Sequence, residues 1–271
     1  MYRLERDDFF KAPILLLWIL LGFQAGFINS FGFLACGRYV SHVTGFGTQI
    51  GMALGDNNFW LAVELLGFPM SFILGAFFSG VFTSARFERG LIPRYDLMTI
   101  VLPVLIFLVG VLGWKGMFGE FGEPLLKAHD FVLLFSLSFA CGLQNGCFAT
   151  MTKGMIRTTH LTGISTDIGS DMARLFFGKQ SKADRKFLLL LNGSRISTFV
   201  AFSVGSIFSV ITTEHIHYTA LVIPFFSSLV VSISVYASMK IDIGSTQDEK
   251  TRDTFGRIKQ FLSALLSRKS I

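Results

Sequence analysis

The sequence predicts an all-α protein that crosses a membrane several times, and its composition and hydropathy pattern carry this prediction. Hydrophobic residues make up 51% of the 271 residues, charged residues only 15%, and the mean hydropathy is +0.57. A soluble domain carries about 25% charged residues, and one core of this size could not bury so much apolar surface. The apolar residues form long continuous runs, which favours helices over the short alternating strands of a membrane β-barrel. These observations exclude a typical cytosolic enzyme, a secreted disulfide-bonded domain and a disordered protein.

Six apolar runs are long enough to cross a bilayer as helices. The first contains no charged residue in 23 positions and would be about 34 Å long as a helix, enough to cross the hydrocarbon core. It is too long for the core of a signal peptide, so we expect it to be retained. The predicted spans are residues 12–34, 58–84, 97–114, 131–150, 187–211 and 218–239.

The positions of lysine and arginine predict how the chain is oriented. If the N-terminus is cytoplasmic, 20 of the 24 lysines and arginines lie in cytoplasmic segments, and only Arg38, Lys115 and Lys127 lie outside. This asymmetry predicts that both termini are in the cytoplasm. The net charge of +6 is therefore a topology signal, and we expect no nucleic-acid partner.

A polar motif occurs twice in the chain. Residues 41–51 read SHVTGFGTQIG and residues 159–169 read THLTGISTDIG, and an asparagine, Asn29 or Asn145, lies upstream near the end of the preceding span. We interpret the motif as the sign of an internal duplication. Because each copy has three spans, the second enters the membrane in the opposite orientation, as in the inverted-topology repeats of many transporters. The predicted parts are a cytoplasmic N-terminus (1–11), a first membrane repeat (12–118), a second membrane repeat (131–239) and a cytoplasmic tail (240–271).

The segments that contain the motifs are too apolar for loops and too short or too polar for full spans. Residues 43–55 carry no charge, and residues 161–178 carry three. If both segments crossed the membrane, the arginines at 86–94 would lie outside, which the charge distribution disfavours. We therefore expect a broken or re-entrant glycine-rich half-helix in each repeat, tolerated where the backbone is buried in protein or lines a wet cavity. The predicted fold class is an all-α polytopic membrane protein with six main transmembrane helices in two inverted three-helix repeats.

The paired motifs resemble those of a known family. The SH-x-TG segment at 41–45 and the TTH-x-TG-xx-TD-x-G segment at 158–169, with Gln-Asn upstream of the second, are similar to the YoaK family of bacterial integral membrane proteins over about residues 12–240. The resemblance implies a bacterial inner-membrane location and the duplicated six-span plan, and it implies no substrate. After the first Thr-Gly pair the family pattern leads us to expect a polar residue, often Asn. This chain has Phe46 there, so we expect the first half-site to be weakened or altered.

The two motif segments supply a candidate solute site. A helix N-terminus exposes unpaired N–H groups and a partial positive charge, so two opposed half-helix starts near the midplane would favour an anion or a polar solute. Thr44 and Thr162 are expected as N-caps at these starts, with or without contact to the solute. His42 and His160 are either interfacial hydrogen-bonding residues or proton relays, and the two asparagines either contact the solute or tie the broken backbone together. The candidate solute-binding residues are Asn29, His42, Thr44, Gly45, Thr48, Gln144, Asn145, His160, Thr162, Gly163, Thr166 and Asp167.

Charged residues within the predicted membrane segments indicate a buried network. Burying a charge in a bilayer costs at least about 2.5–3.5 kcal/mol, so Arg195 needs a partner. Asp167 and Asp171 are spaced to share one helix face toward it, and Arg174 competes for the same acid. Aligning the segments FILGAF and FSVGSI of the two halves makes Glu64 a near-equivalent of Arg195. We expect Glu64, Asp171 and Arg195 to form a charge network, either a structural one or a proton- or anion-coupled pathway.

No catalytic or cofactor motif is visible. The sequence contains no nucleophile elbow, His-Glu-x-x-His motif, phosphate loop or metal-ligand spacing, so we expect neither enzymatic activity nor a metal or cofactor. Cys36, Cys141 and Cys147 are expected to be small buried side chains. Residues 254–268 have apolar side chains at helical spacing and basic side chains on or near the other face, which predicts an amphipathic helix. We expect it on the inner leaflet, or alternatively in a calmodulin-like or other partner groove.

These features predict a small-solute transporter or channel-like permease of the bacterial inner membrane, with its site between the two repeats. The expected partners are the lipid bilayer and a small polar or anionic solute. A rival interpretation is a non-transporting scaffold or receptor that forms a homodimer. Gly47, Gly51 and Gly55 motivate it, because small residues every four positions allow close contact between helices.

Overall fold

The computed structural model describes residues 10–123, 128–152, 154 and 159–240. These residues form helices and connecting turns and contain no strand, which confirms the all-α prediction. The helices are α1 (Ala12–Cys36), α2 (Val43–Gly55), α3 (Phe59–Phe82), α4 (Ser84–Glu88), α5 (Tyr95–Trp114), α6 (Ala128–Met151), α7 (Leu161–Phe177), α8 (Lys182–Ile216), the 3-10 helix η2 (His217–Leu221) and a final helix, residues 222–240. The predicted amphipathic helix at 254–268 lies outside the described residues.

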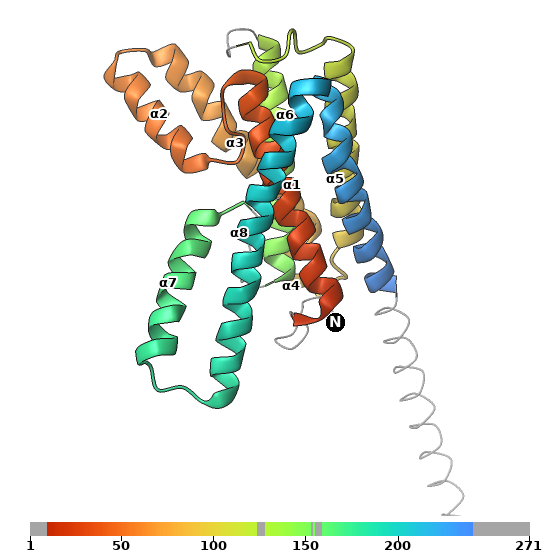
Figure 1. Cartoon of the computed structure of the whole chain (residues 1–271). Helices are drawn as coiled ribbons and strands as arrows, with labels where there is room; N and C mark the ends of the chain where they lie inside the picture. The colour runs from red at the N-terminus through yellow and green to blue at the C-terminus, as the bar shows by residue number, and fades with distance from the viewer. Residues whose placement is uncertain (1–9, 124–127, 153, 155–158, 241–271) are drawn as a thin grey trace, which may run out of the picture.

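Several helices are long and apolar enough to cross a membrane. These segments are Ile14–Cys36, Phe59–Glu88, Tyr95–Trp114, Phe131–Met151 and Lys182–Lys240. The last one comprises α8, η2 and the final helix, and Figure 1 shows the chain reversing its direction at η2. Large apolar side chains such as Trp60, Phe77 and Trp114 are exposed on these segments. Such a surface fits a multi-pass membrane protein whose outer face contacts lipid.

Two helix pairs, α1 with α8 and α3 with α6, form the centre of the structure. α1 and α8 cross so closely that only glycine fits at the crossing. A Cβ atom on Gly26 would lie 1.9 Å from the carbonyl oxygen of Phe202, and a Cβ atom on Gly205 would lie 1.9 Å from the carbonyl oxygen of Phe23. Any side chain there would force the two backbones apart, so these glycines set how α1 and α8 pack.

α3 and α6 cross in the same manner. A Cβ atom on Gly75 would lie 2.1 Å from the carbonyl oxygen of Phe139, and one on Gly142 would lie 2.0 Å from the carbonyl oxygen of Phe72. When the segments before Asn29 and Asn145 are aligned, and FILGAF is aligned with FSVGSI, these four residues correspond to the four at the α1–α8 crossing. The two tightest helix contacts therefore occupy equivalent positions in the two halves of the chain.

Apolar side chains fill the space around these crossings. α5 packs against α6 and η2, and it buries Tyr95 and Met98 in the same core. Cys36, Cys141 and Cys147 are buried free thiols, which confirms the prediction that they are small buried side chains. Most of the buried polar side chains are serines and threonines, so the few buried amide and charged side chains stand out.

α2 and α7, the helices that carry the two polar motifs, begin near the middle of the structure and run toward opposite ends (Figure 1). They have 13 and 17 residues, or about 20 and 26 Å, whereas bilayer hydrocarbon is roughly 30 Å thick. α2 packs on α3 and α7 packs on α8. Each is therefore a short helix held mainly by the helix that follows it.

The starts of α2 and α7 correct one prediction. Thr44 and Thr162 do not occupy the N-cap position, which belongs to His42 in α2 and His160 in α7. The reason is that the carbonyl of each histidine already accepts a helical N–H from the residue four positions later. The threonines thus lie inside the first turn, where their hydroxyls cannot cap it.

Candidate functional site

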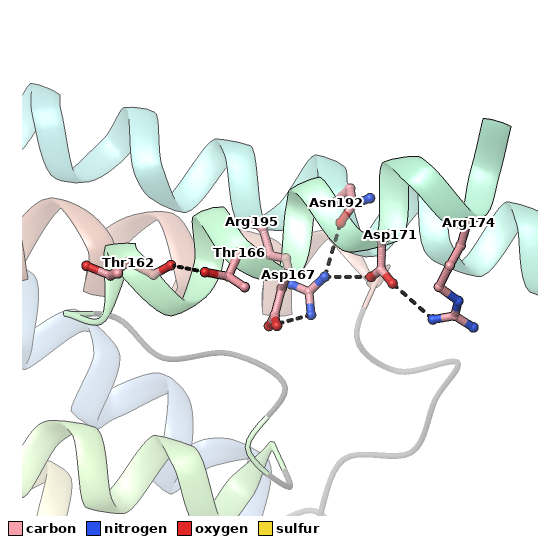
Figure 2. Close-up of polar contacts among 7 residues, drawn as sticks. All are labelled: Thr162, Thr166, Asp167, Asp171, Arg174, Asn192 and Arg195. Atoms are coloured by element: carbon pink, nitrogen blue, oxygen red, sulfur yellow. Dashed lines mark hydrogen bonds and ion pairs between the residues drawn. The ribbon is translucent and has the colours of Figure 1, made fainter. Parts of the chain in front are cut away.

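Arg195 on α8 is the centre of a charge network with α7 (Figure 2). Its Nη1 donates to Asp171 Oδ2 at 2.7 Å and to Asn192 Oδ1 at 3.1 Å. Its Nη2 donates to Asp167 Oδ2 at 2.9 Å. Arg174 Nη1 donates to the other carboxylate oxygen of Asp171 at 3.0 Å. The two aspartates are thus paired with the arginine that their spacing on one helix face indicated.

The network ranges from buried to exposed. The side chains of Arg195 and Asp171 are 8% and 11% exposed, whereas those of Asp167 and Arg174 are 55% and 59% exposed. Two buried donors, Arg195 Nε and Asn192 Nδ2, have no acceptor within the described part of the chain. Because an unsatisfied buried donor costs about 1–3 kcal/mol, the network has hydrogen-bonding capacity that its internal contacts leave unused, while its exposed acid is the half-exposed Asp167.

The α8 surface on either side of Arg195 is mostly apolar, although Gly193 and Ser197 are also exposed there. Leu189 and Leu190 before it and Ile196 and Phe199 after it are exposed, as expected where lipid covers the helix. The outer face of the first part of α7 is different, because only polar residues and glycines are exposed there. These residues are Thr162, Gly163, Ser165, Thr166, Asp167, Gly169 and Ser170. A polar helix face therefore lies next to a helix whose own exposed surface suits hydrocarbon.

Among the described residues of the first half, the positions equivalent to this network carry no ion pair. The residues equivalent to the buried Asp–Arg pair are Ala53 on α2 and Leu65 on α3, and both are buried. The equivalent of Asp167 is Gln49, whose Oε1 accepts a hydrogen bond from Arg38 Nη1 at 2.9 Å. The same helix–helix contact is thus apolar in one half and charged in the other.

Two further residues of the first half depart from the expected site. Glu64 is exposed on α3 and makes no ion pair or hydrogen bond within the described residues, so its expected place in the charge network is wrong. The reason is that α3 packs on α2 and α6, whereas the network lies between α7 and α8. Phe46 is buried and stacks on Phe68 with ring centroids 4.6 Å apart. The aromatic ring thus serves packing between α2 and α3.

The two motif asparagines hold the loops that precede α2 and α7. Asn29 Oδ1 accepts from the backbone N–H of Ser41 at 3.0 Å and from its hydroxyl at 2.9 Å. In the second half, Asn145 Nδ2 donates to the hydroxyl of Thr159. Ser41 and Thr159 are equivalent residues, each directly before the motif histidine. Of the two expected roles, these contacts favour the one that ties the broken backbone together.

The histidines and threonines of the motifs surround the two helix starts. His42 packs edge-on against Tyr39, with ring centroids 6.2 Å apart, and His160 contacts Phe72 at 6.3 Å. A Cβ atom on Gly45 would lie 2.7 Å from His42 Nδ1, so this glycine gives the ring room.

The four threonines are exposed on the helices. Thr48 Oγ1 donates to the carbonyl of Thr44 at 3.3 Å, and Thr166 Oγ1 donates to that of Thr162 at 3.0 Å. A Cβ atom on Gly163 would meet nothing within 4 Å. These hydroxyls have local acceptors and still face outward, so they can also accept a hydrogen bond from a solute.

A second polar cluster lies in the core and contains one predicted candidate, Gln144, and one residue that was not predicted, Gln24. Gln24 Nε2 donates to Gln144 Oε1 at 3.0 Å, Gln144 Nε2 donates to the carbonyl of Leu21 at 3.3 Å, and the Ser227 hydroxyl donates to Gln24 Oε1 at 3.3 Å. Both glutamine side chains are buried. The sequence did contain a signal for Gln24, because it is the only glutamine in the first apolar span, which has no charged residue.

The candidates therefore form separate groups rather than one cluster. Asp167, Asp171 and Arg195 belong to the α7–α8 network, the asparagines hold loops, and Gln144 lies in the core. Within the described part of the chain, no three His, Cys, Asp or Glu side chains come together to hold a metal ion.

Comparison with known proteins gives one match. A family model described as "Protein of unknown function (DUF1275)" matches residues 17–234. No curated protein matches the chain, and no solved structure matches it. The matched range runs from α1 into the final helix and includes both motifs and the Arg195 network.

Proposed function

Because the chain belongs to the DUF1275 family, in which the YoaK proteins are grouped, and because α7 has a polar outer face, we propose that the protein is a small-solute transporter or channel-like permease of the bacterial inner membrane. The observation that carries the proposal is the Arg195 network at the base of that face. The solute is small and polar or anionic, and it binds beside α7.

Arg195 lies well inside an apolar part of α8. It lies 13 residues after Lys182, the first residue of α8, among leucines and other apolar side chains. A charge at that depth costs at least about 2.5–3.5 kcal/mol and normally faces protein or water. The same holds for the half-exposed carboxylate of Asp167. A water-filled cavity along α7 would satisfy both side chains and would give a solute access to them.

The inverted repeat is the second part of the proposal. Equivalent glycine crossings, equivalent asparagine–hydroxyl contacts and two short helices that run in opposite directions support a duplicated unit inserted in both orientations. In this arrangement six main helices cross the membrane, α2 and α7 enter from opposite faces, and both termini are cytoplasmic.

Labelling tests this topology directly. The three native cysteines are buried, so single cysteines introduced in the variants Asp56→Cys and Lys179→Cys, at the exposed far ends of α2 and α7, can be modified selectively. We expect a membrane-impermeant maleimide to reach the two positions from opposite sides of right-side-out and inside-out vesicles. Labelling of both positions from the same side would contradict the inverted arrangement.

Flux measurements test transport. The purified chain is reconstituted in liposomes and screened with radiolabelled monocarboxylates, amino acids, nucleobases and inorganic anions. We expect saturable uptake of one class, reduced at least about ten-fold in Asp171→Asn, the loss produced by about 1.4 kcal/mol. Asp56→Asn, at the exposed end of α2, is the matched control and should retain uptake. Uptake no higher than in empty liposomes for every class would refute the proposal.

A non-transporting scaffold is the second candidate function. Gly47, Gly51 and Gly55 form a stripe on α2, and a Cβ atom on any of them would meet nothing within 4 Å. The stripe could therefore pack against a second copy of the chain. Loss of cross-linked dimers in Gly51→Leu, together with no effect of Asp171→Asn on any solute flux, would favour the scaffold.

A further inference from the structure

α1, α5 and α8 end at the same end of the bundle (Figure 1). A concave site lies there, lined by residues of α5, the turn after it, η2 and the start of the final helix. It consists of two adjoining cavities of about 330 and 510 Å³, and both are lined by Trp114, Tyr218 and Thr219. The smaller cavity lies between α5 and the start of the final helix. The larger one lies beside the turn after α5 and the η2 segment.

The two cavities differ in chemistry. The smaller one is lined almost entirely by apolar side chains, including Phe107, Val111 and Phe225. The larger one contains one carboxylate, Glu120, and an aromatic wall. An apolar groove that continues into a polar pocket has the shape and polarity of a lipid site. The acyl chain would lie in the groove and the headgroup in the pocket.

The polar cavity suits a cation. Phe121, His217 and Tyr218 line it, and the Phe121 ring centroid lies 5.3 Å from that of His217 and 5.2 Å from that of Tyr218. Ammonium groups bind over aromatic faces, and an acidic side chain at the same site adds attraction. Glu120 supplies that acid.

The backbone around this cavity is unusual for the chain. His217 ends α8 with φ 46°, one of two non-glycine residues with positive φ in the described part. Such a conformation is strained for a residue with a side chain, and the surrounding packing must hold it. It turns the chain from α8 into η2 and so puts the His217 ring on the cavity wall.

We propose that this site binds one phospholipid with an ammonium headgroup, such as phosphatidylethanolamine, with the headgroup beside Glu120 and an acyl chain between α5 and the final helix. Lys115, which follows Trp114 and is exposed at the same end, is placed to attract the lipid phosphate. The proposal is independent of transport, because the site lies at the far end of α8 from the α7–α8 network and shares no residue with it.

Lipid retention tests the proposal. The full chain is delipidated in mild detergent, incubated with equal amounts of phosphatidylethanolamine and phosphatidylglycerol, and analysed by native mass spectrometry. We expect wild type to retain phosphatidylethanolamine preferentially. Glu120→Gln should lower the ratio of retained phosphatidylethanolamine to phosphatidylglycerol about five-fold, the size of one cation contact of this kind.

Two further experiments distinguish the contribution of the apolar groove from that of the polar pocket, and binding of a lipid from binding of a soluble amine. Val222→Trp fills the apolar groove and should abolish retention of both lipids, whereas Val230→Trp, on the exposed surface of the same helix, should retain them. Soluble phosphoethanolamine should not compete for the site. Equal retention of both lipids by wild type, an unchanged ratio in Glu120→Gln, or competition by phosphoethanolamine at concentrations equal to the lipid would overturn the proposal.

Discussion

The buried pair between Asp171 and Arg195 can be replaced by the residues that the first half uses at the same positions. Ala53 and Leu65 occupy these positions and are buried between α2 and α3. The variants are Asp171→Ala, Arg195→Leu and the double variant. This series distinguishes a pair that holds α7 on α8 from a pair kept for its charge.

The structure sets the expected magnitudes. Removing one partner of a buried ion pair typically costs 3–5 kcal/mol, because the other charge stays buried and unpaired. In Asp171→Ala, Arg195 keeps Asp167 at 2.9 Å, and in Arg195→Leu, Asp171 keeps Arg174 at 3.0 Å. Both remaining partners are more than half exposed, so their compensation is partial, and we expect each single variant to lose about 2–3 kcal/mol. The double variant removes both buried charges and the unsatisfied Nε, so its free energy of unfolding should lie within about 1 kcal/mol of wild type or above it.

The free energy of unfolding is measured by denaturant titration in mixed micelles, and solute uptake is measured in liposomes with the same protein. A double variant as unstable as the sum of the two single variants would refute the structural reasoning, because the two residues would then act independently. A stable double variant that has lost uptake would support the functional role of the charges. A stable double variant with full uptake would refute that role.

Three further predictions concern the helix packing and the buried hydrogen bonds of the fold. Gly26→Ala should disrupt folding, seen as loss of monodisperse protein in size-exclusion chromatography, because the new Cβ would lie 1.9 Å from a backbone oxygen of α8, whereas Gly51→Ala, in open space, should elute as wild type. Asn29→Ala removes the acceptor of two hydrogen bonds and should lower the free energy of unfolding by about 1–2 kcal/mol, about twice the loss in Ser41→Ala. Gln24→Leu should destabilise by about 1–3 kcal/mol, because it leaves the partner amide unpaired, and the double variant with the partner glutamine also replaced by leucine should recover most of this loss in the same titration.

Hydropathy was sufficient to predict where the helices lie, but their ends needed other information. The run at 187–211 belongs to α8, which begins earlier, at Lys182, and ends later, at Ile216. Charged residues at the start of α8 ended the apolar run without ending the helix, because lysine and arginine are good helix formers. Ser181 caps the helix by accepting a hydrogen bond from the backbone N–H of Asp184, a local signal that hydropathy does not register.

The partners of Arg195 were predictable because both aspartates lie on one helix, α7, and the arginine lies on the next helix along the chain, α8. Asp167 and Asp171 are four residues apart, so their side chains lie on the same face of any α-helix and can both reach the arginine. The partners of Glu64 and Gln24 could not be predicted from spacing along one helix. Which helix packs on which decides their partners, and the pairing of α1 with α8 and α3 with α6 follows from glycine crossings between segments far apart in the sequence.

The difference between the two halves argues for a role of the charges beyond packing. Equivalent backbone crossings and equivalent asparagine contacts occur in both halves, so the scaffold does not require charge. Ala53 and Leu65 are buried at the contact between α2 and α3, and they fill the positions that the buried Asp171 and Arg195 fill between α7 and α8. An ion pair at membrane depth costs more to bury than an apolar pair and offers no packing advantage in return. A charged contact that an apolar one could replace is therefore expected only where its charge or its hydrogen-bonding capacity is used. We expect a solute to use it at the half-exposed Asp167, on the polar face of α7.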